Sequence, residues 1–281
     1  MKRLYCLFII ILCLAISIPS YAQFTINGKH IIYDKQNDTY MACIPEDTFG
    51  KDYEAIILLD IASDWSDLSI DGTQIAYSYT FKQVEGNKLY SIHARKGNKE
   101  INTKITFTFL PLLVLQGSFG YDYAQGSMSL YSPDATEPTI SLIKAKWRGG
   151  STNTEDKHKR NYKIKSINFK GKSQDISLLG MREDNNWIMD AGQIDLFRLR
   201  NRIATEIWND FATKPYYASK EPKAKSGVTG KVVEVILNNE YRGIYSLTEA
   251  MDRKELKLKK YDDKNQEFHG QLWKVSSWDK A

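Results

Sequence analysis

The 281-residue sequence predicts an α+β fold in two parts, and three observations carry this prediction. Short apolar runs separated by turn residues fill residues 23–110, which is typical of β-strands. A stripe of apolar residues at spacings of three and four then predicts one amphipathic helix after Asp195. Two strand patterns at 232–237 and 241–247, joined by Asn238-Asn239-Glu240, predict a hairpin. The helical stripe consists of Leu196, Leu199, Ile203, Ile207 and Phe211.

The first part, residues 23–110, is predicted to be a small β-sandwich. Asn27-Gly28 lies between two apolar runs, and this dipeptide is a strong signal for a two-residue hairpin turn. Further turns at Asp71-Gly72 and Lys96-Gly97 separate strands of similar length. Such regular spacing favours an immunoglobulin-like sandwich. Nothing in this part carries a chemical signature, so we expect an accessory domain.

The N-terminus has the order of a secretory signal peptide. Met1-Lys-Arg precedes an apolar run over residues 4–18, and a small-residue site ends at Ala22. We expect residues 1–22 to be removed and the protein to be exported to the periplasm, cell surface or medium. No later stretch approaches the roughly 20 apolar residues of a membrane span, so we expect no transmembrane segment in the mature chain. That chain would retain only Cys43 and form no internal disulfide.

Positive charge is concentrated in one stretch of the second part. The formal net charge is +5, and it falls to +3 without Lys2 and Arg3, which gives no indication of a nucleic-acid partner. Residues 144–172, however, hold ten cations and few acids. This stretch is either a solvated face or an anion-binding site. The ten are Lys144, Lys146, Arg148, Lys157, Lys159, Arg160, Lys163, Lys165, Lys170 and Lys172.

The centre of this stretch has features suited to phosphate. Arg148-Gly-Gly-Ser-Thr offers flexible backbone N–H groups, two hydroxyls including that of Ser151, and a guanidinium. The strand that follows places Lys163 and Lys165 on one face, because side chains alternate along a strand. Tyr162 and Ile164 then point to the other face. An ordinary exposed hairpin is the alternative interpretation.

The remaining elements of residues 111–281 are predicted from local patterns. Asp195 stands where an N-cap would accept the first free N–H groups of the helix. A short strand is expected at 174–179, a short charged helix at 251–258, and a last strand at 271–275.

Four stretches, in this order, resemble the CotH (spore coat protein H) family of secreted, kinase-like proteins. They cover about residues 111–275. Arg148-Gly-Gly-Ser-Thr and Lys159-Arg-Asn-Tyr-Lys-Ile-Lys resemble the family's Arg-Gly-Asn-Ser-Ser/Thr turn and Lys-Lys-Pro-Tyr-Arg/Lys-Ile-Lys strand, with Gly150 and Asn161 as departures. Asn186-Trp187, Asp195 and Arg200-Asn201 resemble the entry to the family's helix.

The third and fourth stretches extend this resemblance to the C-terminal region. The specific one is Val233-Glu-Val-Ile-Leu-Asn-Asn-Glu-Tyr-Arg-Gly-Ile-Tyr-Ser-Leu-Thr-Glu, which is similar to the family's Glu-Leu-Tyr-Leu-Asn-Gly-Glu-Tyr-Leu-Gly-Val-Tyr-Leu-Leu-Thr-Glu. Gly270-Gln-Leu-Trp-Lys-Val stands in the place of the strand that leads to the family's nucleotide hinge.

The resemblance implies an atypical protein-kinase-like α+β domain that binds ATP with Mg²⁺ and phosphorylates secreted or surface proteins. It implies that Lys165, with Lys163 as the alternative, contacts the ATP phosphates and that Glu249 pairs with this lysine. The implied cofactor-binding set is Arg148, Ser151, Lys163, Lys165, Glu249, Leu272, Trp273 and Lys274, with the last three beside the adenine.

Catalysis would need further residues. Kinase-like folds supply metal-binding and catalytic aspartates after the hinge, and Ala281 follows the expected hinge closely. We therefore assign no catalytic or metal-binding residue and expect a fragment or an inactive truncation. The alternative function is a non-catalytic surface or adhesion protein, in which the sandwich binds glycans or proteins through some of the 17 Tyr and 6 Trp residues. The oligomeric state stays open.

Overall fold

The computed structural model describes residues 24–60, 64–154, 156–267 and 270–273. Within these ranges strands predominate, and α2 (Arg200–Phe211) is the one α-helix. The predominance of strands is consistent with a β-rich domain, whereas the immunoglobulin-like sandwich and the kinase-like α+β domain stay predictions. The expected signal peptide at residues 1–22 lies outside the described ranges. None of the helices in those ranges has the length and apolar character needed to cross a membrane.

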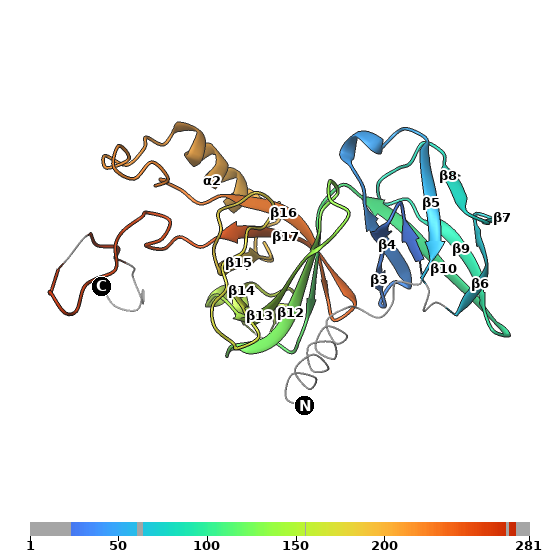
Figure 1. Cartoon of the computed structure of the whole chain (residues 1–281), viewed down its shortest axis with the longest axis horizontal. Coiled ribbons are helices and arrows are strands. Elements are labelled where there is room, and N and C mark those ends of the chain that lie inside the picture. Colours follow the sequence, from blue (N-terminus) through green and yellow to red (C-terminus); the bar gives the residue numbers. More distant parts are fainter. Residues whose placement is uncertain (1–23, 61–63, 155, 268–269, 274–281) are drawn as a thin grey trace, which may run out of the picture.

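Residues 24–108 form two β-sheets around one core, and we call this region the sheet pair (Figure 1). Phe81 from one sheet and Phe107 from the other meet edge to face, with ring centroids 4.8 Å apart. Tyr40, Trp65 and Tyr90 are also buried in this core, so these aromatic side chains serve packing. One sheet has the order β2 (Lys29–His30), β1 (Phe24–Ile26), β5 (Tyr53–Leu59) and β8 (Ser78–Phe81). The other has the order β3 (Ile32–Asp34), β4 (Thr39–Cys43), β10 (Lys99–Thr108), β9 (Tyr90–Lys96), β6 (Trp65–Ile70) and β7 (Thr73–Gln74).

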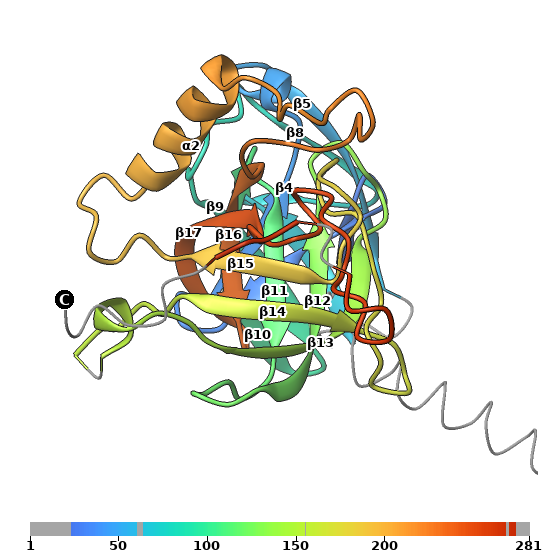
Figure 2. The ribbon, with the colours of Figure 1, turned by 90° about the vertical axis from the view of Figure 1, so that its left-hand side faces the viewer.

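The second region is a closed seven-stranded barrel (Figures 1 and 2). A parallel pair closes it, with Leu112 of β11 opposite Glu234 of β16, and all other neighbours are antiparallel. Apolar side chains such as Ile164, Trp187 and Leu247 fill the interior. The strands, in barrel order, are β11 (Leu112–Gln116), β12 (Ala124–Tyr131), β13 (Thr139–Trp147), β14 (Tyr162–Ile167), β15 (Asn186–Asp190), β17 (Glu240–Glu249) and β16 (Gly230–Leu237).

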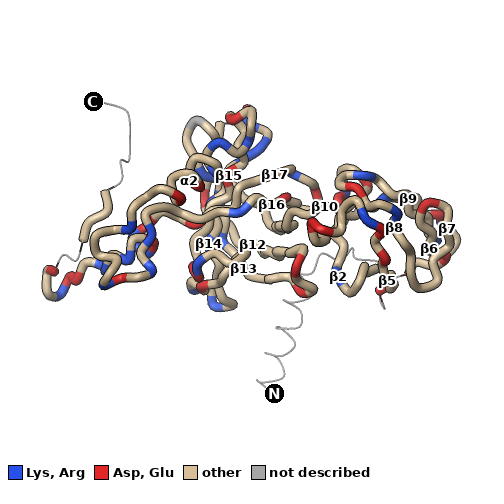
Figure 3. Tube along the Cα trace, turned by 90° about the horizontal axis from the view of Figure 1, so that it is seen from above, with Lys and Arg blue, Asp and Glu red and all other residues tan. Residues whose placement is uncertain are grey.

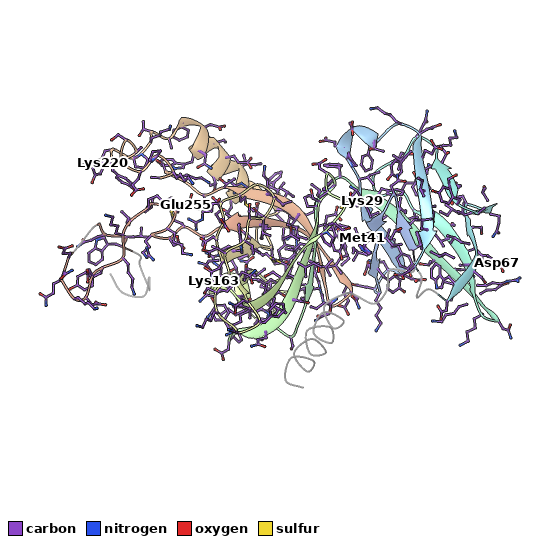
Figure 4. The ribbon with its side chains drawn as sticks, viewed as in Figure 1. Lys29, Met41, Asp67, Lys163, Lys220 and Glu255 are labelled. Atoms are coloured by element: carbon purple, nitrogen blue, oxygen red, sulfur yellow. The ribbon has the colours of Figure 1, made fainter. Side chains whose placement is uncertain are left out.

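The two regions pack against each other through a third apolar cluster. Met41 and Cys43 of the sheet pair meet Leu112 and Ile236 of the barrel there, and Figure 4 labels Met41 on the side of the sheet pair that faces the barrel. At the rim of this cluster, the Thr108 hydroxyl donates to Glu234 Oε1 at 2.9 Å. The two regions thus share a buried contact rather than a bare linker.

Two predicted hairpin turns are confirmed by their backbone geometry. Asn27 and Gly28 between β1 and β2 have φ angles of 49° and 74°, and Asn238 and Asn239 between β16 and β17 have 53° and 65°. Two consecutive positive φ values define the turn that matches the twist of antiparallel strands. Asn and Gly adopt this conformation at low cost.

Four local predictions are wrong in part. The helix begins at Arg200 instead of next to Asp195, because Asp195 caps a preceding turn in which Arg198 has a φ of 63°. Residues 251–258 form turns instead of a helix, and Gln271–Trp273 form no strand, while Lys274 and Val275 lie outside the described residues. The strand expected at 174–179 is reduced to a single bridge between Ile176 and Asp184.

Candidate functional site

Four lysines lie on the outer face of the barrel wall, and we call them the lysine face. Lys144 of β13 pairs in register with Lys165 of β14, and Lys146 pairs with Lys163. Because residues directly opposite each other share a face, these four side chains point to the same side of the wall. Figure 2 shows β13 and β14 as neighbours, Figure 3 colours the Lys and Arg positions along the whole chain, and Figure 4 labels Lys163. The predicted alternation is confirmed, since Tyr162 and Ile164 are buried inside the barrel.

Like charges placed directly opposite each other oppose strand pairing. Within the described ranges, no carboxylate forms an ion pair with Lys144, Lys146 or Lys165. The lysine face is therefore a concentration of positive charge without an internal counter-charge on these three residues. An anion placed on this face would offset the repulsion.

Tyr123, just before β12, is a member of this site that the sequence reasoning missed. Lys165 Nζ lies 4.7 Å and Lys146 Nζ 5.2 Å from the centroid of its ring. The negative face of the ring attracts both ammonium groups and holds them at a common point. The sequence does show a polar, glycine-bearing loop with Tyr121 and Tyr123 just before a strand. However, only the pairing of that strand with β13 shows that Tyr123 lies beside Lys146 and Lys165.

The turn after β13 has a backbone geometry that requires glycine, as its sequence indicated. Gly149 has a φ of 112°, and a Cβ there would lie 2.1 Å from Thr152 Oγ1, so the turn requires glycine. The Arg148 N–H donates to the Asn161 carbonyl at 2.9 Å. Arg148 follows Lys144 and Lys146 at the same two-residue interval, one residue beyond the strand end, and its side chain is exposed. Ser151 begins a 3₁₀ turn (Ser151–Asn153).

Asn161, one of the two departures from the family pattern, holds this turn in place. Its side-chain amide donates to Thr152 Oγ1 at 3.2 Å. Its Oδ1 accepts the N–H of Ala191 at 2.6 Å, next to the end of β15. Asn161 thereby connects the turn to the neighbouring strand, which a proline in this position would not do through its side chain.

Glu249 does not pair with Lys165, so this expectation is wrong. Ile164, Trp187 and Glu249 lie side by side on three neighbouring strands and all point into the barrel, whereas Lys165 points outward. The barrel wall separates the two charges. The Glu249 carboxylate instead accepts the N–H groups of Arg182 at 2.9 Å and Thr229 at 2.8 Å.

Glu249 belongs to a buried ionic network at one end of the barrel. Lys225 Nζ lies 3.3 Å from its carboxylate, and Arg182 contacts both Asp184 and Glu255 at 2.5 Å. Burial, followed by the charge of Glu249, raises the pKa of Glu255. The network ties the segment after β17, on which Figure 4 labels Glu255, to the end of the barrel. This geometry indicates a structural role for Glu249, which we call a clamp because the network fixes the segment after β17 to the barrel.

Leu272 and Trp273, expected beside an adenine, are 45% and 85% exposed. They belong to the last described segment, which leads away from the barrel (Figure 1). Lys274 lies outside the described residues. Their role as an adenine border stays a prediction, as does the nucleotide contact of Arg148, Ser151, Lys163 and Lys165.

Residues 145–280 match the family model described as "CotH kinase protein". No curated protein matches the chain. The matched residues include the glycine turn, β14 with its lysines, α2 and the β16–β17 hairpin. The resemblance of this region to the CotH kinase family is thereby confirmed.

Proposed function

We propose that this protein is an exported, CotH-type kinase-like protein that binds the phosphates of ATP on the lysine face. One observation carries this proposal: Lys144, Lys146, Lys163 and Lys165 stand as two opposed pairs on the outer wall. The family match over residues 145–280 supports a kinase-like protein of the transferase type.

The residues of the lysine face fit a triphosphate. Lysine provides up to three donors and a full positive charge, and charge-assisted hydrogen bonds to phosphate are stronger than neutral ones. Tyr123 draws Lys146 and Lys165 together, and the exposed Arg148 turn lies at the end of the same face. Bound ATP would supply a transferable γ-phosphoryl group. The phosphoacceptor would be an exported or surface protein.

The described residues do not show a site for Mg²⁺. Among them, no group of three or more His, Cys, Asp or Glu side chains is arranged to hold a metal ion. Magnesium in nucleotide sites is usually held by one or two carboxylates together with the phosphates. The proposal names no metal ligand and no catalytic residue.

The test is ATP affinity in single-lysine variants, measured by calorimetry with and without Mg²⁺. We expect Lys165→Ala and Lys144→Ala each to weaken ATP binding by about ten-fold or more, the effect of losing one charge-assisted contact. Lys99→Ala is the matched control, since Lys99 is an exposed strand lysine on β10 of the sheet pair. Unchanged ATP affinity in both lysine-face variants would remove the basis of the proposal.

A further inference from the structure

The barrel has a second cationic site, which is separate from the lysine face. A pocket of about 410 Å³ opens at the end of the barrel beside the 148–161 turn. We call it the mouth pocket, and no Asp or Glu is among its described lining residues. β14 separates the two sites, because Tyr162 points inward toward the pocket and Lys163 points outward. The residues that matter here are Phe119, Trp147, Arg160, Tyr162, Arg242 and Tyr245.

The guanidinium of Arg160 is positioned by uncharged groups. Its guanidinium donates to the carbonyl oxygens of Asn153 at 2.7 Å and Thr154 at 2.6 Å. It also stacks on Trp147, with 4.6 Å between the guanidinium carbon and the ring centroid. Carbonyls and an aromatic ring orient a guanidinium without cancelling its charge. Arg160 is thus fixed at the rim with its positive charge available.

Arg242 of β17 supplies a second guanidinium to the lining of the pocket. Its partner Glu240 lies at 2.5 Å, but both side chains are partly exposed, at 38% and 44%. Such a surface ion pair has little net strength and can be exchanged for a better partner. A nearby ammonium reinforces the local positive charge, because Lys159 lies 4.3 Å from the Tyr245 ring centroid and contacts the Ile244 carbonyl.

The inner wall of the pocket carries two phenol groups. Tyr245 is 2% exposed and Tyr162 is 6% exposed. Burial raises the pKa of both hydroxyls, so both stay protonated and remain hydrogen-bond donors. For the Tyr245 hydroxyl, the described part of the chain provides no hydrogen-bond partner. The Tyr245 side chain is buried, but it lines the open pocket, where its hydroxyl can donate to an acceptor atom of a ligand.

These groups together define the chemistry of a ligand. Two guanidinium groups and a protonated phenol match the oxygens of a phosphate, and the rings of Phe119 and Trp147 match a flat apolar body. We propose that the mouth pocket binds an aromatic phosphate monoester, the chemistry of a phosphotyrosine side chain. The proposal does not depend on ATP binding at the lysine face.

The experiment titrates the full chain with phenyl phosphate, inorganic phosphate and ATP, and follows binding by calorimetry. We expect phenyl phosphate to bind at least about ten-fold more tightly than inorganic phosphate, because only the ester uses the aromatic walls. Arg242→Gln should weaken phenyl phosphate binding by about ten-fold or more, and Tyr245→Phe by about three- to ten-fold. Tyr245→Phe removes a single oxygen and preserves packing, so it keeps the test valid if Arg242→Gln disturbs the fold.

Two controls separate this site from the lysine face. Arg95→Gln changes an exposed arginine of the sheet pair and should leave phenyl phosphate binding unchanged. Lys165→Ala should also leave it unchanged, although it weakens ATP binding if the lysine face holds the nucleotide. Phenyl phosphate binding that is absent, or equal in wild type and Tyr245→Phe, would overturn the proposal. ATP that displaces phenyl phosphate and loses its own binding in Arg242→Gln would also overturn it, by identifying the pocket as a nucleotide site.

Discussion

The sheet pair and the barrel differ in where their charged side chains lie. In the sheet pair, the core is apolar and aromatic and the ion pairs lie at the surface, as with Lys82 and Asp52, whose side chains are 75% and 48% exposed. The barrel buries Asp184, Glu249 and Glu255 at one end and gathers cations at the other end and on its wall. Buried or crowded charges cost stability unless something compensates them. The barrel is therefore the region where charge points to a function, and the sheet pair is the region built for packing.

The largest expected effect comes from the barrel core. Trp187 is fully buried and packs among the side chains of the barrel interior. Trp187→Ala should lower the free energy of unfolding by about 3–5 kcal/mol, the usual cost of removing a large core side chain. Urea unfolding followed by circular dichroism measures this. Trp208→Ala, at a 47% exposed position on α2, is the control and should cost much less.

Glu249 tests whether the buried network is a clamp. Glu249→Gln removes the charge that Lys225 and two backbone N–H groups contact, and should cost about 2–3 kcal/mol. Hydrogen exchange should then rise in residues 225–229 and 250–258, which the network ties down. Asp52→Asn in the sheet pair should change stability little, because that pair is exposed. Equal effects of the two substitutions would contradict the contrast between the regions.

Cys43 reports on the contact between the regions. It is 5% exposed, and burial raises the pKa of its thiol to about 11. At pH 8 we expect labelling of Cys43 by a thiol reagent to be roughly 100-fold slower in the folded protein than in urea, since the thiolate reacts. Mass spectrometry of the peptide that contains Cys43 measures the rate. Ile236→Ala, on the barrel side of the same cluster, should speed the labelling by loosening the contact.

Local patterns were sufficient for the turns and for the faces of strands. Asn238-Asn239 predicted the β16–β17 hairpin because two residues that tolerate positive φ are needed there. The outward direction of Lys163 and Lys165 followed from alternation alone. The partner of Glu249 could not be predicted from alternation, because it depends on the register of β15 with both β14 and β17. Likewise, the parallel pairing of β11 with β16 joins residues more than 100 positions apart, and no local pattern predicts it.

The mistaken elements near α2 have local causes that the pattern did not reveal. The apolar stripe predicted the helix, yet Ile203, Ile207 and Phe211 are 50%, 54% and 65% exposed. The Asp195 carboxylate accepts the N–H of Arg200, the first helical residue, as expected of a capping group, but it also accepts the N–H of Phe197 in the turn that separates it from the helix. A capping residue and its periodic stripe therefore predicted that a helix exists more reliably than where it begins.

The smallest expected effect is the pH dependence that Lys159 gives to the barrel. Burial, and next the charge of Arg198, lower the pKa of Lys159 to about 8, while in the unfolded chain it is near 10.5. Between these values the unfolded state binds more protons, so stability should rise with pH from about 8 to 10. Because Lys159 is partly exposed, we expect a gain below about 1 kcal/mol. The difference in urea midpoint between wild type and Lys159→Met should therefore shift in favour of wild type as the pH rises, and a constant difference would show that Lys159 carries no such penalty.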